Sequence, residues 1–115
     1  MNKKKFFQNY FNKISTNLNL VDHKLLFKSV DLVKSTKKNN NKIIIVGNGG
    51  SAAMASHVAV DLTKVGGIRA INFNEADLIT CFANDYGYEN WVLKALNFYA
   101  DENDLVILIS SSGKS

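Results

Sequence analysis

The sequence of 115 residues contains a single cysteine, Cys81. One cysteine excludes an internal disulfide and a cysteine-rich metal cluster, and it suits a reducing compartment, so we expect a cytoplasmic protein. The lysine-rich start is similar to the charged opening of a signal peptide, but polar residues such as Gln8 and Asn12 interrupt the apolar segment that follows. We therefore expect no export signal, no membrane span and no membrane partner.

Arginine is absent from the first 42 residues, where ten lysines face only Asp22 and Asp31. Beyond Lys42, eight acidic residues outnumber four basic ones. Such asymmetry is one feature of arms that bind nucleic acid. Here the lysines alternate with asparagines and with apolar residues at helical spacing. This pattern favours a solvated helix face, and we expect no nucleic-acid partner.

The glycine-rich stretch Gly47–Ser51 has neither the Gly-x-Gly-x-x-Gly spacing of dinucleotide sites nor the Gly-Lys-Ser/Thr ending of nucleotide-triphosphate loops. It follows the apolar run Ile43–Val46 and precedes an alanine-rich segment, which predicts a buried parallel strand, a loop and a helix. Three glycines let the backbone approach a ligand closely, and Ser51 is a suitable N-cap. We expect an anion such as a phosphate beside Ser51; an ordinary tight turn is the alternative.

Two amphipathic helices are predicted before this stretch. Residues 3–19 carry an aromatic stripe, which indicates either contact with another subunit or docking on the protein's own core. Asp22 is expected to cap the second helix, which fades in residues 37–41. The apolar stripe of the first helix consists of Phe6, Phe7, Tyr10, Phe11, Ile14 and Leu18, and that of the second of Leu25, Leu26, Val30 and Val33.

Strands and helices are predicted to alternate in the rest of the chain. The helix after Ser51 should end at Gly66, and His57 and Asp61 lie one turn apart at the edge of its buried stripe. That stripe is expected to contain Met54, Ala55, Val58, Leu62 and Val65. Further elements are expected as a strand at 68–73, a helix at 75–83, a turn at 84–88, a helix at 89–99 and a strand at 105–109.

This alternation predicts parallel βαβ units. In such sheets ligands bind beyond the carboxyl ends of the strands. The loops at 47–51 and 110–115 both follow strands and should open at that same edge. Together they favour a phosphate pocket, whereas either loop alone would be read as an ordinary polar loop.

Four segments, specific only in combination, resemble the sugar isomerase (SIS) domains and within them the phosphoheptose isomerases: Gly47–Ser51, His57 with Asp61, Phe82–Gly87 and Ser110–Ser115. The resemblance implies a flavodoxin-like three-layer αβα parallel sheet, of which this chain would hold the first three strands in the order 2-1-3. It also implies a helical segment at 1–41, which would lie in the interface of a homotetramer. Residues 42–115 would form the N-terminal part of a SIS domain.

The resemblance further implies an active site shared between subunits. Asn84 and Asp85 would touch the sugar, while Asp61 would be the acid/base residue and, with His57, a ligand of one zinc ion. The residues that would line the sugar-phosphate site are Asn48, Gly49, Gly50 and Ser51, and those that would hold the phosphate are Ser110, Ser111, Ser112 and Ser115. Without the resemblance, a surface hydrogen-bonded pair would be the simplest interpretation of His57 and Asp61.

Asp61 stands where the family pattern has a glutamate. An aspartate keeps the charge but reaches about 1.5 Å less far, and a displacement of about 1 Å can cost on the order of a hundredfold in rate. The family's other zinc ligands, a glutamine and a histidine, lie on a later helix. Nothing here replaces them, so we expect a fragment that binds metal weakly and is inactive alone.

For the intact protein the resemblance implies an aldose–ketose isomerase. It would convert sedoheptulose 7-phosphate to D-glycero-D-manno-heptose 7-phosphate in heptose biosynthesis for bacterial surface polysaccharides such as lipopolysaccharide. One alternative is a non-catalytic SIS domain that binds a sugar phosphate or a protein partner, similar to relatives that associate with the bacterial replication initiator. The other alternative is a truncated product without function.

The strand at 105–109 would be an apolar edge of the sheet. We therefore expect the isolated chain to be poorly soluble.

Overall fold

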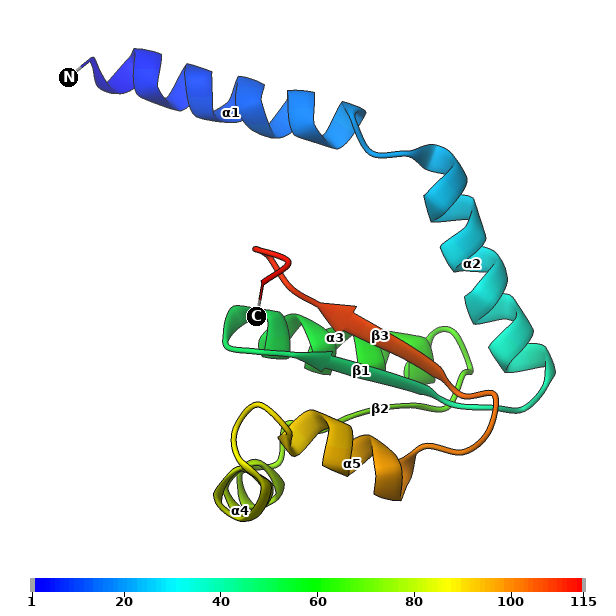
Figure 1. The fold of residues 1–115 in the computed structure, drawn as a ribbon. Coiled ribbons are helices and arrows are strands. Elements are labelled where there is room, and N and C mark those ends of the chain that lie inside the picture. Colours follow the sequence, from blue (N-terminus) through cyan, green and yellow to red (C-terminus); the bar gives the residue numbers. More distant parts are fainter. Residues whose placement is uncertain (1, 115) are drawn as a thin grey trace. The chain divides into compact units, whose positions relative to one another are not determined.

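The computed structural model of the protein describes residues 2–114, which contain five helices and three strands (Figure 1). Contacts divide the chain into two compact units, Met1–Asp31 and Leu32–Ser115. The resemblance implies a different division, into a helical segment at 1–41 and a domain part at 42–115. That division stays a prediction. None of the described helices is both long enough and apolar enough to cross a membrane.

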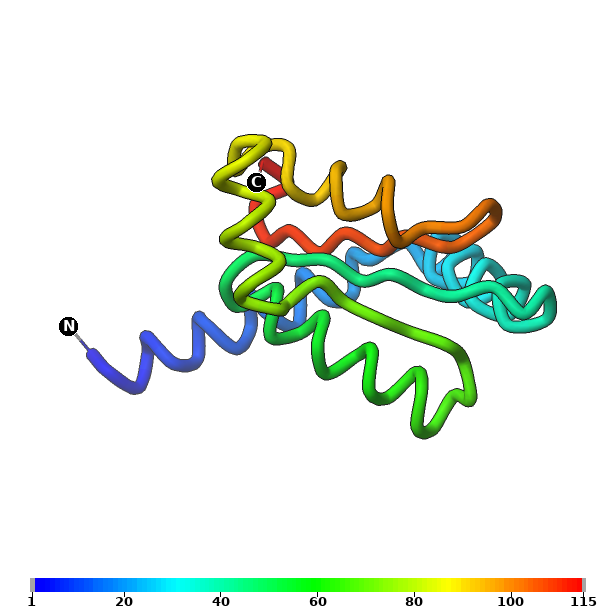
Figure 2. Tube along the Cα trace, turned by 90° about the horizontal axis from the view of Figure 1, so that it is seen from below, coloured from blue at the N-terminus to red at the C-terminus, as the bar shows by residue number. Residues whose placement is uncertain are grey.

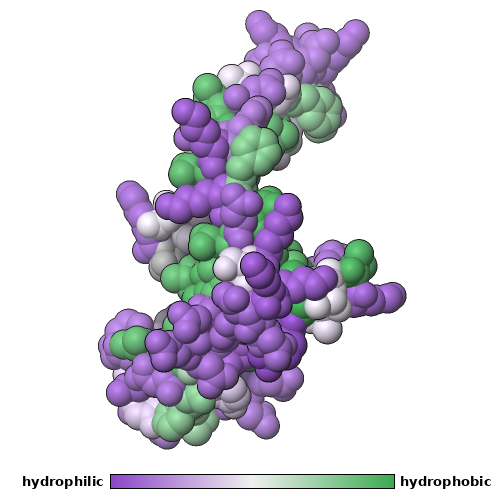
Figure 3. Space-filling model, turned by 90° about the vertical axis from the view of Figure 1, so that its right-hand side faces the viewer, coloured by the Kyte–Doolittle hydropathy of each residue, from purple (hydrophilic) through white to green (hydrophobic). Residues whose placement is uncertain are grey.

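The first unit contains helix α1 (Lys3–Asn19), which has the predicted bounds. Its aromatic rings contact each other along the helix, with Phe6 stacked on Tyr10 and Phe7 on Phe11 at centroid distances of 6.5 and 6.2 Å. All six side chains of its apolar stripe are exposed, by 41% to 65%. Figure 3 shows such hydrophobic side chains at the surface among hydrophilic ones. Contact with another subunit stays a prediction.

Helix α2 (His23–Lys38) begins where the sequence predicts it to begin. The Oδ1 atom of Asp22 accepts a hydrogen bond from the backbone N–H of Lys24 at 2.8 Å, which is the expected capping contact. Within the second unit, Val33 of this helix packs against the core beside β1.

The second unit contains a parallel three-stranded sheet in the order β2-β1-β3, as predicted. Its central strand β1 (Ile43–Gly47) pairs with β3 (Leu105–Ile109) along its whole length, from Ile43 opposite Leu105 to Gly47 opposite Ile109. On its other side, β1 pairs with β2 (Ala70–Asn72), which is shorter than the expected strand at 68–73. The fold is the α/β architecture that the resemblance implies.

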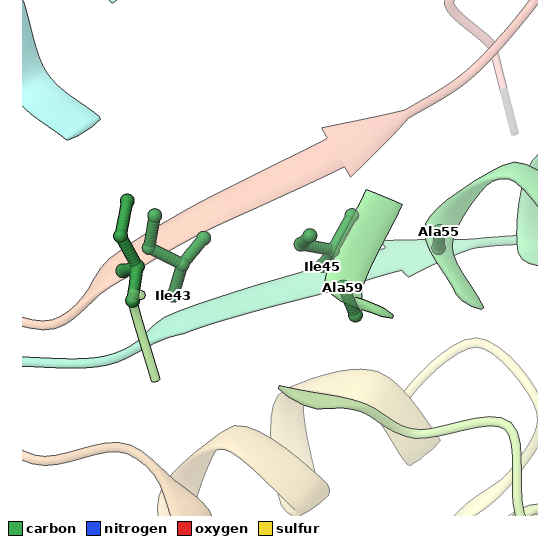
Figure 4. Packing of buried hydrophobic residues seen from close by; sticks show 5 residues of the cluster. Ile43, Ile45, Ala55 and Ala59 are labelled. Carbon is green, nitrogen blue, oxygen red and sulfur yellow. The ribbon is translucent and has the colours of Figure 1, made fainter. Parts of the chain in front are cut away.

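Helices cover both faces of β1, and this explains why all its first four residues are apolar. Ile43 and Ile45 pack against Ala55 and Ala59 of α3 (Gly50–Lys64), as the close-up in Figure 4 shows. The alternate residues Ile44 and Val46 face the opposite way. They pack against Trp91 and Ala95 of α5 (Trp91–Tyr99) and against Phe73. All four strand residues are at most 5% exposed.

The buried stripe of α3 differs from the expected one. Ala55 and Ala59 approach the sheet, whereas Met54, Val58 and Val65 are 57%, 37% and 82% exposed, so their prediction as core is wrong. Small side chains let the helix approach the strand closely, and this close approach turns the larger residues outward. The apolar pattern of the sequence alone does not show which residues of α3 face the sheet.

Helix α4 (Ala76–Tyr86) also differs from prediction, because it continues through residues 84–86, where a turn was expected. The chain leaves the helix only at Gly87, whose φ of 84° lies in the region that favours glycine. Asn84 and Asp85 are frequent in turns, but here they occupy the last helical turn. The expected interruption is therefore shifted to the segment 87–90.

At the amino ends of β1 and β3, Lys42 and Asp104 form a partly buried ion pair, with Nζ 2.5 Å from Oδ2. The side chain of Asp104 is 2% exposed, which raises its pKa, but hydrogen bonds outweigh this burial and lower the pKa from 3.8 to about 2. These bonds come from Lys42 Nζ and from the backbone N–H groups of Asp101 and Lys42. Hydrogen bonds with Asp101 and Asp104 in turn raise the pKa of Lys42.

Candidate functional site: the carboxyl edge of the sheet

The two predicted phosphate loops begin side by side. Gly47, the last residue of β1, pairs with Ile109, the last residue of β3, so Asn48 and Ser110 follow neighbouring strand ends. Figures 1 and 2 show the β1–α3 loop, the α4–α5 turn and the segment after β3 at one end of the sheet. The expectation that both loops open at the same edge is confirmed.

The glycine-rich loop turns sharply into α3. A Cβ atom on Gly47 would lie 2.4 Å from the backbone carbonyl of Ser51, so only glycine fits this close approach. Gly49 has a φ of 55° and is itself the N-cap of α3, without a side-chain capping bond. The prediction of Ser51 as N-cap is wrong, because the cap is Gly49 and the helix therefore begins two residues earlier than predicted. Ser51 lies in the first turn, where its N–H donates to the carbonyl of Asn48 at 3.0 Å.

A cavity of about 520 Å³ lies at this edge, and both loops contribute to its wall. Its lining combines polar groups with an apolar wall from β3 and the start of α5. The lining residues are Val46, Gly47, Asn48, Tyr88, Glu89, Trp91, Val92, Leu108, Ile109 and Ser110. Among residues 2–114 its lining holds one carboxylate, Glu89, and no lysine or arginine, so the donors that these residues offer an anion are uncharged N–H and O–H groups.

Side-chain hydrogen bonds shape the polar part of this cavity. The hydroxyl of Tyr88 donates to Oδ1 of Asn48 at 3.0 Å. In the serine loop, Oγ of Ser110 accepts from the N–H of Gly113 at 3.0 Å, and Oγ of Ser112 accepts from the N–H of Lys114 at 3.1 Å. These contacts curl the loop back on itself beyond β3. Ser111 lies exposed within it, and Ser115 lies outside the described residues.

His57 and Asp61 meet on α3, with Nε2 3.4 Å from Oδ2, and their side chains are 80% and 60% exposed. Neither residue belongs to the cavity lining. Among residues 2–114 no third histidine, cysteine, aspartate or glutamate joins them in a metal-binding cluster. A catalytic zinc site needs about three protein ligands. His57 and Asp61 alone are therefore too few ligands for a complete zinc site.

Asn84 and Asp85 lie on the exposed last turn of α4, outside the cavity lining. Nδ2 of Asn84 donates to Oδ1 of Asp85 at 3.0 Å, and Sγ of Cys81 lies 3.7 Å from Oδ2 of Asp85. The structure thus gathers Asn48 and Ser110 but places Asn84, Asp85, His57 and Asp61 elsewhere on the surface of the same unit. Their roles in binding and catalysis stay predictions.

Three residues near the site were not singled out from the sequence. Tyr88 and Trp91 line the cavity, yet the sequence places them in a turn and on an ordinary apolar helix face. Asn74, which follows β2, donates from Nδ2 to the carbonyl of Ala52 at 2.7 Å and to Oγ of Ser56 at 2.6 Å. Its position after a strand at the carboxyl edge is the one signal that could have marked it.

A parallel sheet with helices on both faces and a cavity beyond the ends of two adjacent strands defines the class of α/β proteins that bind ligands at the carboxyl edge. The family model described as SIS domain matches residues 7–115. The chain belongs to the SIS domain family.

Similar proteins that are named phosphoheptose isomerase support this assignment. A phosphoheptose isomerase from Helicobacter pylori (strain ATCC 700392 / 26695) is 42% identical over 96 residues, covering 78% of this chain and 50% of the relative. One from Cytophaga hutchinsonii is 37% identical over 93 residues, covering 76% of this chain and 49% of the relative. The chain spans about half the length of these curated relatives.

Solved structures show the same similarity. The phosphoheptose isomerase GmhA from Neisseria gonorrhoeae superposes with a TM-score of 0.83 at 27% identity, covering 100% of this chain and 64% of that one. A phosphoheptose isomerase from Francisella tularensis also gives 0.83, at 26% identity and the same coverage. The resemblance drawn from the four sequence segments is therefore confirmed.

Proposed function

We propose that the protein is an aldose–ketose isomerase that acts on a phosphorylated sugar. The observation that carries this proposal is that Asn48 and Ser110, from loops 62 residues apart in the sequence, line one cavity of about 520 Å³. Amide and hydroxyl groups beside glycine-rich backbone suit the oxygens of a phosphate ester. The names of the relatives favour a seven-carbon sugar, with sedoheptulose 7-phosphate as substrate and D-glycero-D-manno-heptose 7-phosphate as product.

The reaction moves one proton between adjacent carbons and one between their oxygens. A base takes the proton from the carbon beside the carbonyl group, an enediolate forms, and the proton returns to the neighbouring carbon. We assign the base to Asp61, whose exposed carboxylate is accessible to a substrate. Because it lies outside the cavity lining, this assignment requires the reacting carbons to extend from the bound phosphate beyond that lining toward α3.

A zinc ion is the metal that this site would hold. Bound zinc would supply Lewis-acid chemistry, and His57 and Asp61 would be two of its ligands. Residues 2–114 offer no third ligand for it. The residues of this chain bind the phosphate, position the sugar and move the proton.

A non-catalytic sugar-phosphate sensor is the second candidate. The separation of His57 and Asp61 from the cavity lining favours it, because binding at the cavity does not require either residue.

A coupled assay on the complete protein, as its gene encodes it, separates the two candidates. Turnover of sedoheptulose 7-phosphate that disappears in Asp61→Asn supports the isomerase. Micromolar binding of the sugar phosphate without turnover would contradict the isomerase and support the sensor.

A further inference from the structure

Tyr88 lies on the short turn between α4 and α5, and its side chain reaches the loop that follows β1. Its hydroxyl donates to Oδ1 of Asn48, a residue 40 positions earlier in the sequence, at 3.0 Å. Both residues line the cavity that the two phosphate loops share. The contact joins the turn on the α5 side of the sheet to the glycine-rich loop.

The turn that carries Tyr88 is tightly constrained. Gly87 has a φ of 84°, a backbone conformation that residues with a side chain rarely adopt. Asn90 closes the turn, since its N–H donates to the carbonyl of Gly87 and its Nδ2 to the carbonyl of Tyr86, both at 3.0 Å. The phenol of Tyr88 is therefore attached to a turn that two hydrogen bonds of Asn90 hold closed.

A side-chain amide has one end that accepts hydrogen bonds and one end that donates them. In Asn48 the accepting end is engaged by Tyr88, and Nδ2 has no hydrogen-bond acceptor among residues 2–114. The donating end is thus left for a ligand in the cavity. Donors suit the oxygens of an anion, and a rotated amide would present its own oxygen to that anion instead.

We propose that Tyr88 is a positioning residue for phosphate: by holding Oδ1 of Asn48, it fixes the amide so that Nδ2 binds the phosphate of the ligand. This inference rests on the proposed function only in naming a sugar phosphate as the ligand. It assigns to Tyr88 an indirect role, because the phenol acts through Asn48 and does not itself bind the phosphate.

The test measures the binding of inorganic phosphate to the complete protein through the ¹⁵N-labelled side-chain amide of Asn48. Tyr88→Phe removes the hydroxyl and keeps the ring, and we expect phosphate to bind about 3- to 10-fold more weakly. Tyr86→Phe is the matched control: its ring contacts Phe82 and Lys94, but its hydroxyl takes part in none of the hydrogen bonds described above. This control should bind phosphate as the unmodified protein does.

A double-mutant cycle distinguishes positioning from a general structural effect. This cycle is read by isothermal titration, because Asn48→Ala removes the amide probe. In an Asn48→Ala background, Tyr88→Phe should weaken phosphate binding no further. Equal binding by Tyr88→Phe and the unmodified protein, an undiminished effect in the Asn48→Ala background, or no phosphate binding at all would each overturn the inference. Phosphate binding that depends on Tyr88, without turnover of any heptose phosphate, would support the inference while contradicting the isomerase.

Discussion

The Nε2 atom of His57 lies 3.4 Å from Oδ2 of Asp61, one helical turn further along α3. An α-helix brings residues four apart onto the same face, so this pair needs no tertiary contact to form. Both side chains are mostly exposed, which leaves them accessible to a substrate, a metal ion or a second subunit. Their chemistry has to be tested by substitution.

Asp61→Asn removes the proposed base while keeping the shape of the side chain. We expect the turnover of sedoheptulose 7-phosphate by the complete protein to fall by about 10²- to 10⁴-fold. Binding of the sugar phosphate should change by less than about threefold, because Asp61 does not line the cavity. A coupled assay and isothermal titration measure the two quantities.

Two matched variants complete this experiment. Asp77→Asn changes an exposed acid in the first turn of α4 and should leave turnover unaffected. Asp61→Glu restores the reach of the glutamate in the family pattern and should retain turnover. Undiminished turnover in Asp61→Asn would contradict the assignment of the base.

The ion pair of Lys42 and Asp104 makes stability depend on pH. The pKa of Asp104 falls from 3.8 to about 2 on folding, so the native state binds fewer protons than the unfolded state between these values. The stabilisation, about 2 kcal/mol, is fully present above about pH 5 and is lost as pH falls through 2. Asp104→Asn should lower the free energy of unfolding by about this amount at pH 7 and change it little near pH 2.

Asp101→Asn provides the comparison, since Asp101 also contacts Lys42 Nζ but its side chain is 79% exposed. Exposed pairs contribute little, so we expect a change within about 0.5 kcal/mol. Urea unfolding at several pH values measures both variants. If both variants lose the same free energy of unfolding at pH 7, the burial of Asp104 does not explain the stabilisation.

Asn74 ties the segment after β2 to α3 through its two hydrogen bonds to Ala52 and Ser56. Asn74→Ala removes both and leaves the partly buried carbonyl of Ala52 without this donor. We expect the free energy of unfolding to fall by about 1–3 kcal/mol. Asn97→Ala on the exposed face of α5 should change it by less than about 0.5 kcal/mol. If thermal unfolding shows the same effect for both variants, Asn74 does not connect the two segments.

Strand β3 pairs only with β1 among the described residues, and Val106 and Leu108 are 36% and 69% exposed. An apolar edge of this kind can pair with another chain and aggregate. We expect the isolated 115-residue chain to be poorly soluble and Val106→Lys to raise its soluble fraction severalfold. Light scattering after centrifugation measures this. A monodisperse unmodified chain that unfolds cooperatively would contradict the prediction.

Much of the fold follows from periodicity in the sequence. The run Ile43–Val46 is apolar at every position, which predicts coverage of both faces, and the structure places α3 on one face and α5 on the other. The order of the strands came from the family resemblance, because periodicity does not specify pairing. The buried side of α3 was mispredicted, since close packing selected Ala55 and Ala59 over larger residues.

The candidate site was predictable where it depends on topology. Parallel strands end at one edge, so the meeting of Asn48 and Ser110 could be expected from the sequence. The contribution of Tyr88 could not be predicted, because it depends on how the four-residue turn 87–90 directs one side chain toward a loop 40 residues away. Such contacts arise from tertiary structure and leave no pattern in the chain.

A crystal structure of the complete protein with sedoheptulose 7-phosphate tests the central claim most directly. The account predicts that one phosphate group lies within about 3 Å of donors from both loops, Asn48 in 47–51 and Ser110 in 110–115. A phosphate bound by only one loop, or bound away from this edge of the sheet, would contradict it.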